Sequence, residues 1–116
     1  MTVRGLLILL AALHGLAGVI FAALGAHAGG GMVVMTGATI ELIHALAAIV
    51  ALVIVPGRLG EVAALAFLAG SLLFAGGLYA SGLGGVSLGP VAPTGGVLLM
   101  LGWVLLAAAA IRTGRE

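Results

Sequence analysis

Hydrophobic residues run almost without interruption through four stretches of this chain, and short glycine- or proline-rich segments separate them. The stretches cover residues 5–26, 35–55, 61–82 and 94–111. Each is close to the roughly 20 apolar residues that a helix needs to cross a bilayer core. The alternation typical of membrane barrel strands is absent, so the pattern predicts four transmembrane helices. Thr94, which follows Pro93, is expected to cap the last one.

Composition changes this picture only by excluding other classes. The 116 residues are 64% hydrophobic and 6% charged, with a mean hydropathy of +1.44, whereas soluble domains are about 45–50% apolar. Too little polar surface remains to coat a soluble particle. We therefore expect an all-α integral membrane protein whose residues 1–116 form a single transmembrane domain. The four basic residues are spread along the chain and form no basic face for nucleic acid, and without cysteine there is no thiolate metal site.

The first stretch resembles a secretory signal peptide. Arg4 precedes an apolar core over residues 6–13, and Ala26-His27-Ala28 has the small-x-small pattern of a cleavage site. The apolar run nevertheless continues to Ala26, which is long enough to span a bilayer. We therefore expect a first span that is retained.

The arginines predict the orientation of the spans. Four spans place both termini and the 56–60 turn on one side, and Arg4, Arg58, Arg112 and Arg115 all lie there. The opposite loops contain no arginine or lysine. The positive-inside rule then predicts that both termini are cytoplasmic. We expect a multi-pass membrane protein.

Small residues predict how the helices meet. Lipid gives helices no hydrophobic reason to associate, so close approach through glycine, alanine and serine has to hold them together. The chain has 21 glycines, many of them at helical spacing. This pattern predicts a four-helix bundle made of two hairpins. The glycines expected at helix contacts are Gly15, Gly18, Gly25, Gly70, Gly76, Gly77, Gly95, Gly96 and Gly102.

A few polar side chains interrupt the apolar spans and are the candidates for a site. Glu41 is expected about two turns from the outer end of the second span, near enough for the helix dipole to favour its charge, with His44 one turn deeper. His27 and Tyr79 lie near the outer ends of their own spans. These four residues could form a polar cluster in the outer half of the bundle, with His14 closer to the mid-plane.

Such a cluster has a structural and several functional interpretations. Pairing of Glu41 with His27 or His44 would fix how the helices fit together. Alternatively, the cluster is a small-molecule, ion or proton-linked binding or transport site. A metal site using His14, Glu41 and His44 is a remote alternative, because the chain lacks the further carboxylates of a di-iron bundle. A haem between His14 and His44 is equally remote, because two histidines on neighbouring spans are a weak signal. We expect no cofactor. The sequence also contains no arrangement of a nucleophile with a general base, so it does not predict an enzyme.

Five short motifs follow one another in a particular order: ALGAHA (23–28), HALA (44–47), FAGGLY (74–79), APTGG (92–96) and LGW (101–103). In this order they resemble domain-of-unknown-function family 423, small bacterial membrane proteins related to a eukaryotic protein of similar size. Leu24, Ala75 and Gly77 depart from the pattern of that family. The resemblance implies several membrane spans, a location in the inner membrane of a bacterium and no established activity. The matching residues are His27, His44, Phe74, Gly76, Leu78, Tyr79, Pro93, Gly95, Gly96, Gly102 and Trp103.

The expected role is therefore non-catalytic. The loops are too short to work on soluble substrates, which favours an accessory or assembly partner within a larger membrane complex, or a homo-oligomer. In either case we expect the lipid bilayer to surround the protein. The alternative is a binding or transport site around Glu41 and His44.

Overall fold

The computed structural model describes residues 1–113, and this part of the chain forms four α-helices. They are α1 (Val3–His27), α2 (Gly31–Ile54), α3 (Gly57–Gly84) and α4 (Val91–Thr113). At about 1.5 Å per residue, even the shortest helix measures about 35 Å, which exceeds a hydrocarbon core of about 30 Å. All four are long and apolar enough to cross a membrane. The predicted all-helical, four-span architecture is confirmed.

Each helix begins before the apolar stretch that predicted it, and all except α2 also end after it. α2 begins at Gly31, four residues earlier than expected, and α4 begins at Val91. Pro93 therefore lies in the first turn of α4, where its missing N–H removes no helical hydrogen bond. The backbone N–H of Thr94 donates to the carbonyl oxygen of Pro90 at 2.9 Å. Thr94 is thus inside the helix, and its expected role as the cap was wrong.

Two of the turns depend on glycine. Gly30, before α2, has a φ of 78°, and Gly85, after α3, has a φ of 65°. L-residues with a side chain rarely adopt these left-handed conformations. A Cβ on Gly30 would also lie only 2.9 Å from the carbonyl oxygen of Gly82. The turn between α1 and α2 therefore packs directly on the end of α3.

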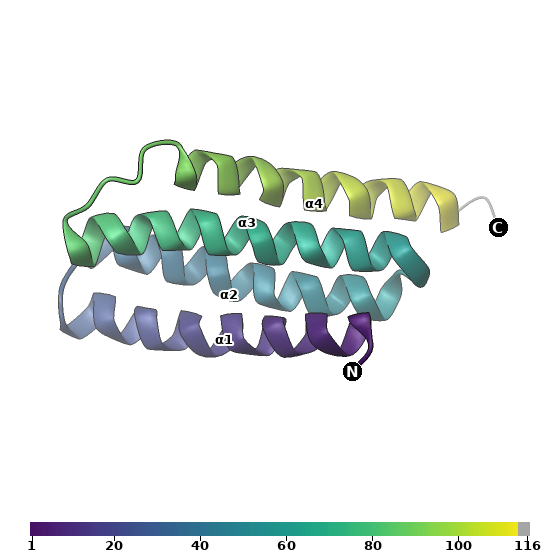
Figure 1. The fold of residues 1–116 in the computed structure, drawn as a ribbon, viewed down its shortest axis with the longest axis horizontal. Helices are drawn as coiled ribbons and strands as arrows, with labels where there is room; N and C mark the ends of the chain where they lie inside the picture. The colour runs from purple at the N-terminus through teal and green to yellow at the C-terminus, as the bar shows by residue number, and fades with distance from the viewer. Residues whose placement is uncertain (114–116) are drawn as a thin grey trace.

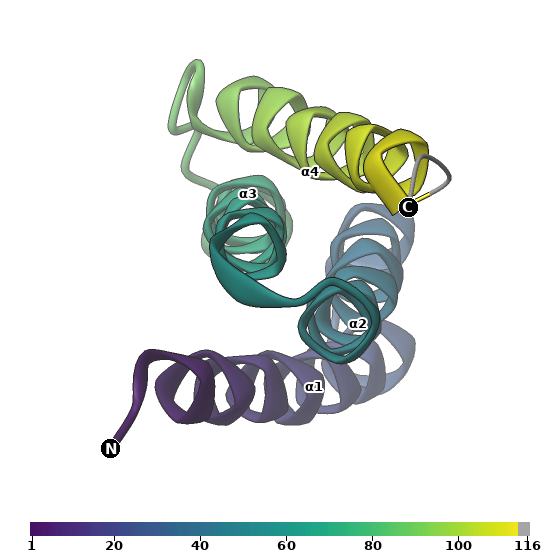
Figure 2. The same ribbon diagram turned by 90° about the vertical axis from the view of Figure 1, so that its right-hand side faces the viewer.

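The central pair of helices is α2 and α3, and α1 and α4 flank this pair on opposite sides (Figures 1 and 2). α1 packs on α2 and more lightly on α3, while α4 packs mainly on α3. In the most apolar 18 residues of each helix, half are buried in α2 and in α3, against 17% in α1 and 22% in α4. The two flanking helices therefore present most of their surface to the surrounding lipid.

The glycines divide into those that permit close contact and those that do not. A Cβ on Gly70 would lie 2.9 Å from the carbonyl oxygen of Gly95, so α3 and α4 touch backbone to backbone. A Cβ on Gly96 would make only an ordinary contact. A Cβ on Gly15 or Gly76 would have no neighbouring atom within 4 Å. These three differ from the prediction because helical spacing alone does not show which face meets a neighbour. The predicted contact glycines that are tightly packed are Gly18, Gly25, Gly70, Gly77, Gly95 and Gly102.

Three arginines lie at one end of the molecule, which we name the arginine end. Arg4 is at the start of α1, Arg58 at the start of α3 and Arg112 at the end of α4, and Figure 1 shows these helix ends together. Arg115 lies outside the described residues. The helices thus bring these arginines together as expected, while the side of the membrane that they face stays a prediction.

Candidate functional site

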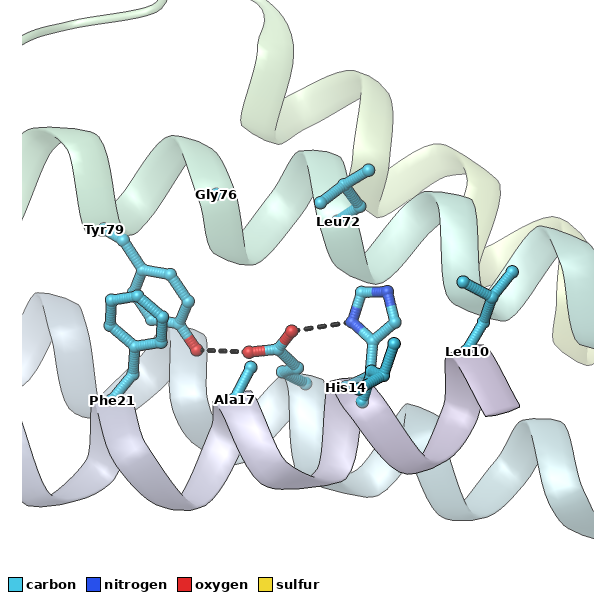
Figure 3. A pocket seen from close by; sticks show the side chains of 9 residues that line it. Leu10, His14, Ala17, Phe21, Leu72, Gly76 and Tyr79 are labelled. Carbon is cyan, nitrogen blue, oxygen red and sulfur yellow. Dashed lines mark hydrogen bonds and ion pairs between the residues drawn. The ribbon is translucent and has the colours of Figure 1, made fainter. Parts of the chain in front are cut away.

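Glu41 on α2 is the centre of a polar group formed by three helices. Its side chain is almost fully buried, with 4% of the residue exposed. The hydroxyl of Tyr79 on α3 donates to Oε1 of Glu41 at 2.7 Å. Nδ1 of His14 on α1 lies 2.6 Å from Oε2 (Figure 3). One carboxylate therefore connects α1, α2 and α3.

This group lies near the middle of the membrane. Glu41 is ten residues from the first residue of α2, which is about 15 Å along the helix and about half of a hydrocarbon core. It is therefore deeper than expected, because α2 begins earlier than the apolar pattern indicated. The dipole effect fades within the first turn of a helix. Hydrogen bonds with Tyr79 and His14, rather than the dipole, stabilise the polar oxygens of Glu41.

Tyr79 is held in place by two residues that the sequence did not single out. Its ring stacks on Phe21 of α1, with ring centroids 3.8 Å apart and an interplanar angle of 8°. Gly37 leaves room for the ring, since a Cβ there would lie 2.9 Å from Cε1 of Tyr79. Gly37 precedes Glu41 by four residues and so shares its helix face. The four-residue spacing between Gly37 and Glu41 is the sequence signal that could have identified Gly37.

A cavity of about 520 Å³ opens beside the polar group between α1 and α3, and we name it the central cavity. Leucine side chains form much of its wall, and Glu41, His14 and Tyr79 supply its polar atoms (Figure 3). A largely apolar cavity with a few convergent polar groups is the usual form of a small-molecule site. Its lining residues are Leu10, Leu13, His14, Ala17, Phe21, Glu41, Leu72, Gly76 and Tyr79.

His14 presents its second ring nitrogen as the free polar atom of this cavity. Nε2 points away from Glu41 in Figure 3 and has no hydrogen-bond partner among the described residues. A net charge in the membrane interior is costly, so the His14–Glu41 pair favours a total charge of zero. In both neutral arrangements of the pair, imidazolium with carboxylate or imidazole with carboxylic acid, Nε2 carries a proton. Nε2–H of His14 is therefore a hydrogen-bond donor that faces the cavity.

His44 belongs to a different place in the structure. Its Nδ1–H donates to the carbonyl oxygen of Ile40 at 2.7 Å, and the indole N–H of Trp103 donates to its Nε2 at 3.0 Å. A carbonyl only accepts and an indole N–H only donates, so His44 is neutral with its proton on Nδ1. The expected pairing of Glu41 with His44 is not found. Glu41 bonds towards α1 and α3, whereas His44 bonds towards α4.

An aromatic cluster surrounds His44 and fastens α4 to the bundle. The rings of Phe67 and Trp103 lie 5.0 Å apart in an edge-to-face arrangement, and each is within 6 Å of the His44 ring. Gly102 lets α4 approach, because a Cβ there would lie 2.6 Å from Cδ1 of Phe67. This second polar contact is well explained as helix packing. Trp103 is nevertheless 47% exposed on its outer side.

His27 lies at the end of α1, is exposed and does not join the group around Glu41. In residues 1–113, no three His, Asp or Glu side chains are close enough together to hold a metal ion. Both ring nitrogens of His44 are engaged in hydrogen bonds. A haem or metal bound through His14 and His44 would require the contact with Trp103 or with Ile40 to break.

A family model described as a protein of unknown function (DUF423) matches residues 21–96, which is more than half of the chain. The chain belongs to this family. The DUF423 match includes Glu41, His44 and Tyr79 but ends before Trp103 and begins after His14. Comparison with curated proteins and with solved structures gave no match. Family membership therefore assigns no activity, which has to be argued from the site.

Proposed function

We propose that this DUF423 protein is a non-catalytic membrane protein that binds a lipid-soluble molecule in the central cavity. The observation that carries the proposal is the free Nε2 of His14, which opens into a largely apolar cavity of about 520 Å³. A polar atom near the middle of a membrane is costly unless it has a partner. A ligand oxygen that accepts a hydrogen bond would supply that partner.

The polar group supports binding more than catalysis. Tyr79 and His14 each use one polar atom to hold Glu41, which leaves a single donor for a ligand. The ligand class that fits is an apolar molecule with a carbonyl, ester or ether oxygen. Such a molecule can enter from the lipid between α1 and α3, the two walls of the cavity.

The first test is to fill the cavity without disturbing the bundle. Gly76 lines the cavity and has no atom within 4 Å of an added Cβ, so Gly76→Leu places a side chain in the empty space. Gly15 is equally free of neighbours but does not line the cavity, and Gly15→Leu is the matched control. Each protein is purified from membranes in mild detergent, and its organic extract is examined by mass spectrometry.

We expect one lipid-soluble species to be enriched over bulk lipid in the wild type and in Gly15→Leu. In Gly76→Leu it falls about tenfold or more, the change that a loss of about 1.4 kcal/mol of binding produces. Equal amounts in the two variants, or no enriched species in the wild type, would contradict the proposal.

The second test addresses the hydrogen bond. Asparagine at position 14 places an amide N–H close to where Nδ1 lies and has no atom in the place of Nε2. His14→Asn therefore keeps a donor for Glu41 and loses the donor that faces the cavity. We expect normal thermal stability together with loss of the enriched species. Unchanged retention of that species would exclude His14 as its binding partner.

An accessory role in a larger membrane complex is a second proposal, and Trp103 is the observation that favours it. Trp103 lies about 18 Å along α4, near mid-membrane, and is 47% exposed. Membrane tryptophans are enriched instead at the two interfaces. A helix of another subunit, or of a second copy, would cover it. Native purification that gives only a free monomer under several mild conditions would count against this role.

A further inference from the structure

A second cavity, of about 330 Å³, lies between α1 and α3 near the arginine end, and we name it the arginine-end cavity. Leu10 lines both this cavity and the central cavity, so the two follow one another along the same helix pair. Its walls are aliphatic, from Leu6, Leu7, Val62 and Leu65 among others. Its charged residues are Arg58 and Glu61.

The charges at this cavity leave one cation without a partner. Glu61 Oε1 lies 4.0 Å from Nη1 of Arg4, so Arg4 offsets the charge of the one carboxylate in the wall. Arg58 is exposed and makes no ion pair or hydrogen bond with the residues that the structure describes. A guanidinium group presents several N–H donors in a plane, which matches the oxygens of a phosphate.

The shape of the cavity suits a chain attached to that phosphate. From Arg58 to Leu65 the wall of α3 rises about 10 Å, which is most of the roughly 15 Å of hydrocarbon in one leaflet. Arg58 marks the end of this wall that lies at the helix terminus, where lipid headgroups are found. An apolar wall that starts at a free arginine is complementary to a molecule with an anionic head and an aliphatic tail.

We propose that the arginine-end cavity binds one anionic membrane lipid. Arg58 contacts its phosphate, and one acyl chain lies between α1 and α3 as far as Leu10. This site is independent of the ligand proposed for the central cavity.

The experiment separates a built site from the general attraction of arginines for anionic lipid. Arg58→Gln removes the cation at the cavity, and Arg112→Gln removes a cation at the same end of the molecule, on α4 and away from the cavity. Arg58→Lys keeps the charge. Each protein is placed in mixed micelles containing phosphatidylglycerol and phosphatidylcholine with identical acyl chains. Native mass spectrometry then counts the lipids retained.

The wild type should retain one phosphatidylglycerol in preference to phosphatidylcholine. A basic side chain near an anionic lipid surface changes binding by about fivefold, so Arg58→Gln should lower that preference about fivefold. Arg112 does not line the cavity and so makes no direct contact with the retained lipid; Arg112→Gln should therefore change the preference by less than about twofold, since attraction across water is screened by salt. Arg58→Lys should restore most of the preference. A wild type without preference, or an equal loss in the two glutamine variants, would overturn the proposal. Displacement of the lipid by inorganic phosphate alone would overturn the role of the acyl chain.

Val62→Trp provides a test that leaves every charge in place. Val62 lines the arginine-end cavity and is exposed there, so a larger side chain fills the cavity without entering the core. Retention of phosphatidylglycerol should fall as it does in Arg58→Gln. If Val62→Trp retains the lipid as the wild type does, the acyl chain lies elsewhere. None of these variants alters His14, Glu41 or Gly76, so failure of this proposal leaves the central cavity untouched.

Discussion

At the scale of single residues, the two side-chain oxygens of Glu41 matter most for stability, because they join α2 to α1 and α3. Glu41→Leu leaves the Tyr79 hydroxyl and Nδ1 of His14 without a partner in the membrane interior. Interhelical hydrogen bonds in membranes contribute about 0.6 kcal/mol on average and about 1.7 at most. We therefore expect Glu41→Leu to lower the free energy of unfolding by about 1–3 kcal/mol. Reversible unfolding in mixed micelles measures this change.

Two variants act as controls for this prediction. In Glu41→Gln the amide oxygen still accepts from Tyr79 and the amide N–H can donate to His14, so the loss should be smaller than in Glu41→Leu. Glu61→Gln removes only a partly exposed ion pair at 4.0 Å, and such pairs contribute about 0–1 kcal/mol. If Glu41→Leu is as stable as the wild type, the three side chains do not form a stabilising network.

The sequence places Glu41 and Tyr79 in one cluster, and the structure joins them by a hydrogen bond. The sequence misses His14 as the partner of Glu41 and Trp103 as the partner of His44, for a geometric reason. Glu41 and His44 are three residues apart, so they share a broad helix face but differ by roughly 60° in direction. In a bundle that difference is enough to aim two side chains at different neighbouring helices. The spacing of residues along one helix does not show where the neighbouring helices lie. The partners of Glu41 and His44 therefore required the structure.

At the scale of helices, the contact between α3 and α4 depends on single glycines. Gly95 faces the backbone of α3, where an added Cβ would lie within 2.6 Å of the carbonyl oxygen of Gly70. Neither backbone can move aside cheaply, so Gly95→Ala should push α4 outward and cost about 1–3 kcal/mol. Gly96 is the matched control, because a Cβ there lies 3.8 Å from Phe74 Cδ2, an ordinary contact.

Trp103 reports this displacement directly, since it is the only tryptophan in the chain. Its indole N–H bonds to His44 in the native arrangement. In Gly95→Ala, movement of α4 should lengthen that bond and shift the tryptophan emission, together with the loss of stability. Gly96→Ala should show neither change. A normal emission spectrum in Gly95→Ala would mean that α4 tolerates the added methyl group.

Glycine content predicts close helix packing but not its location. Gly76 and Gly77 are neighbours, yet a Cβ on Gly77 would meet Ala92 of α4 at 2.9 Å while Gly76 faces the central cavity. Adjacent residues on a helix point about 100° apart, so one faces a neighbour and the other does not. A stripe of small residues therefore predicts that two helices associate, but it does not show which of these residues form the contact.

At the scale of the whole molecule, the apolar stretches and the absence of charge determine nearly all of the architecture. A helix that crosses lipid must satisfy its own backbone, so length and hydropathy are enough to predict four spans. The two cavities between α1 and α3 did not follow from the same reasoning. They depend on the distance between two helices that both pack on α2, and no residue pattern encodes that distance.

The orientation of the molecule is the last prediction, and the absence of cysteine makes it simple to test. Arg4, Arg58 and Arg112 share one end, while the α3–α4 loop at the other end carries no charged residue. The positive-inside rule then places Ser87 outside the cell and Arg112 in the cytoplasm. Both side chains are exposed, so Ser87→Cys and Arg112→Cys should each fold normally.

A membrane-impermeant maleimide added to intact cells should label Ser87→Cys and spare Arg112→Cys. Arg112→Cys should react once the membrane is permeabilised, which shows that its thiol is accessible. The reverse pattern would place the arginine end outside. The lipid proposed for Arg58 would then come from the outer leaflet, because that cavity opens at the same end as Arg4. Labelling of both positions in intact cells would indicate a mixed orientation, which the arrangement of the arginines argues against.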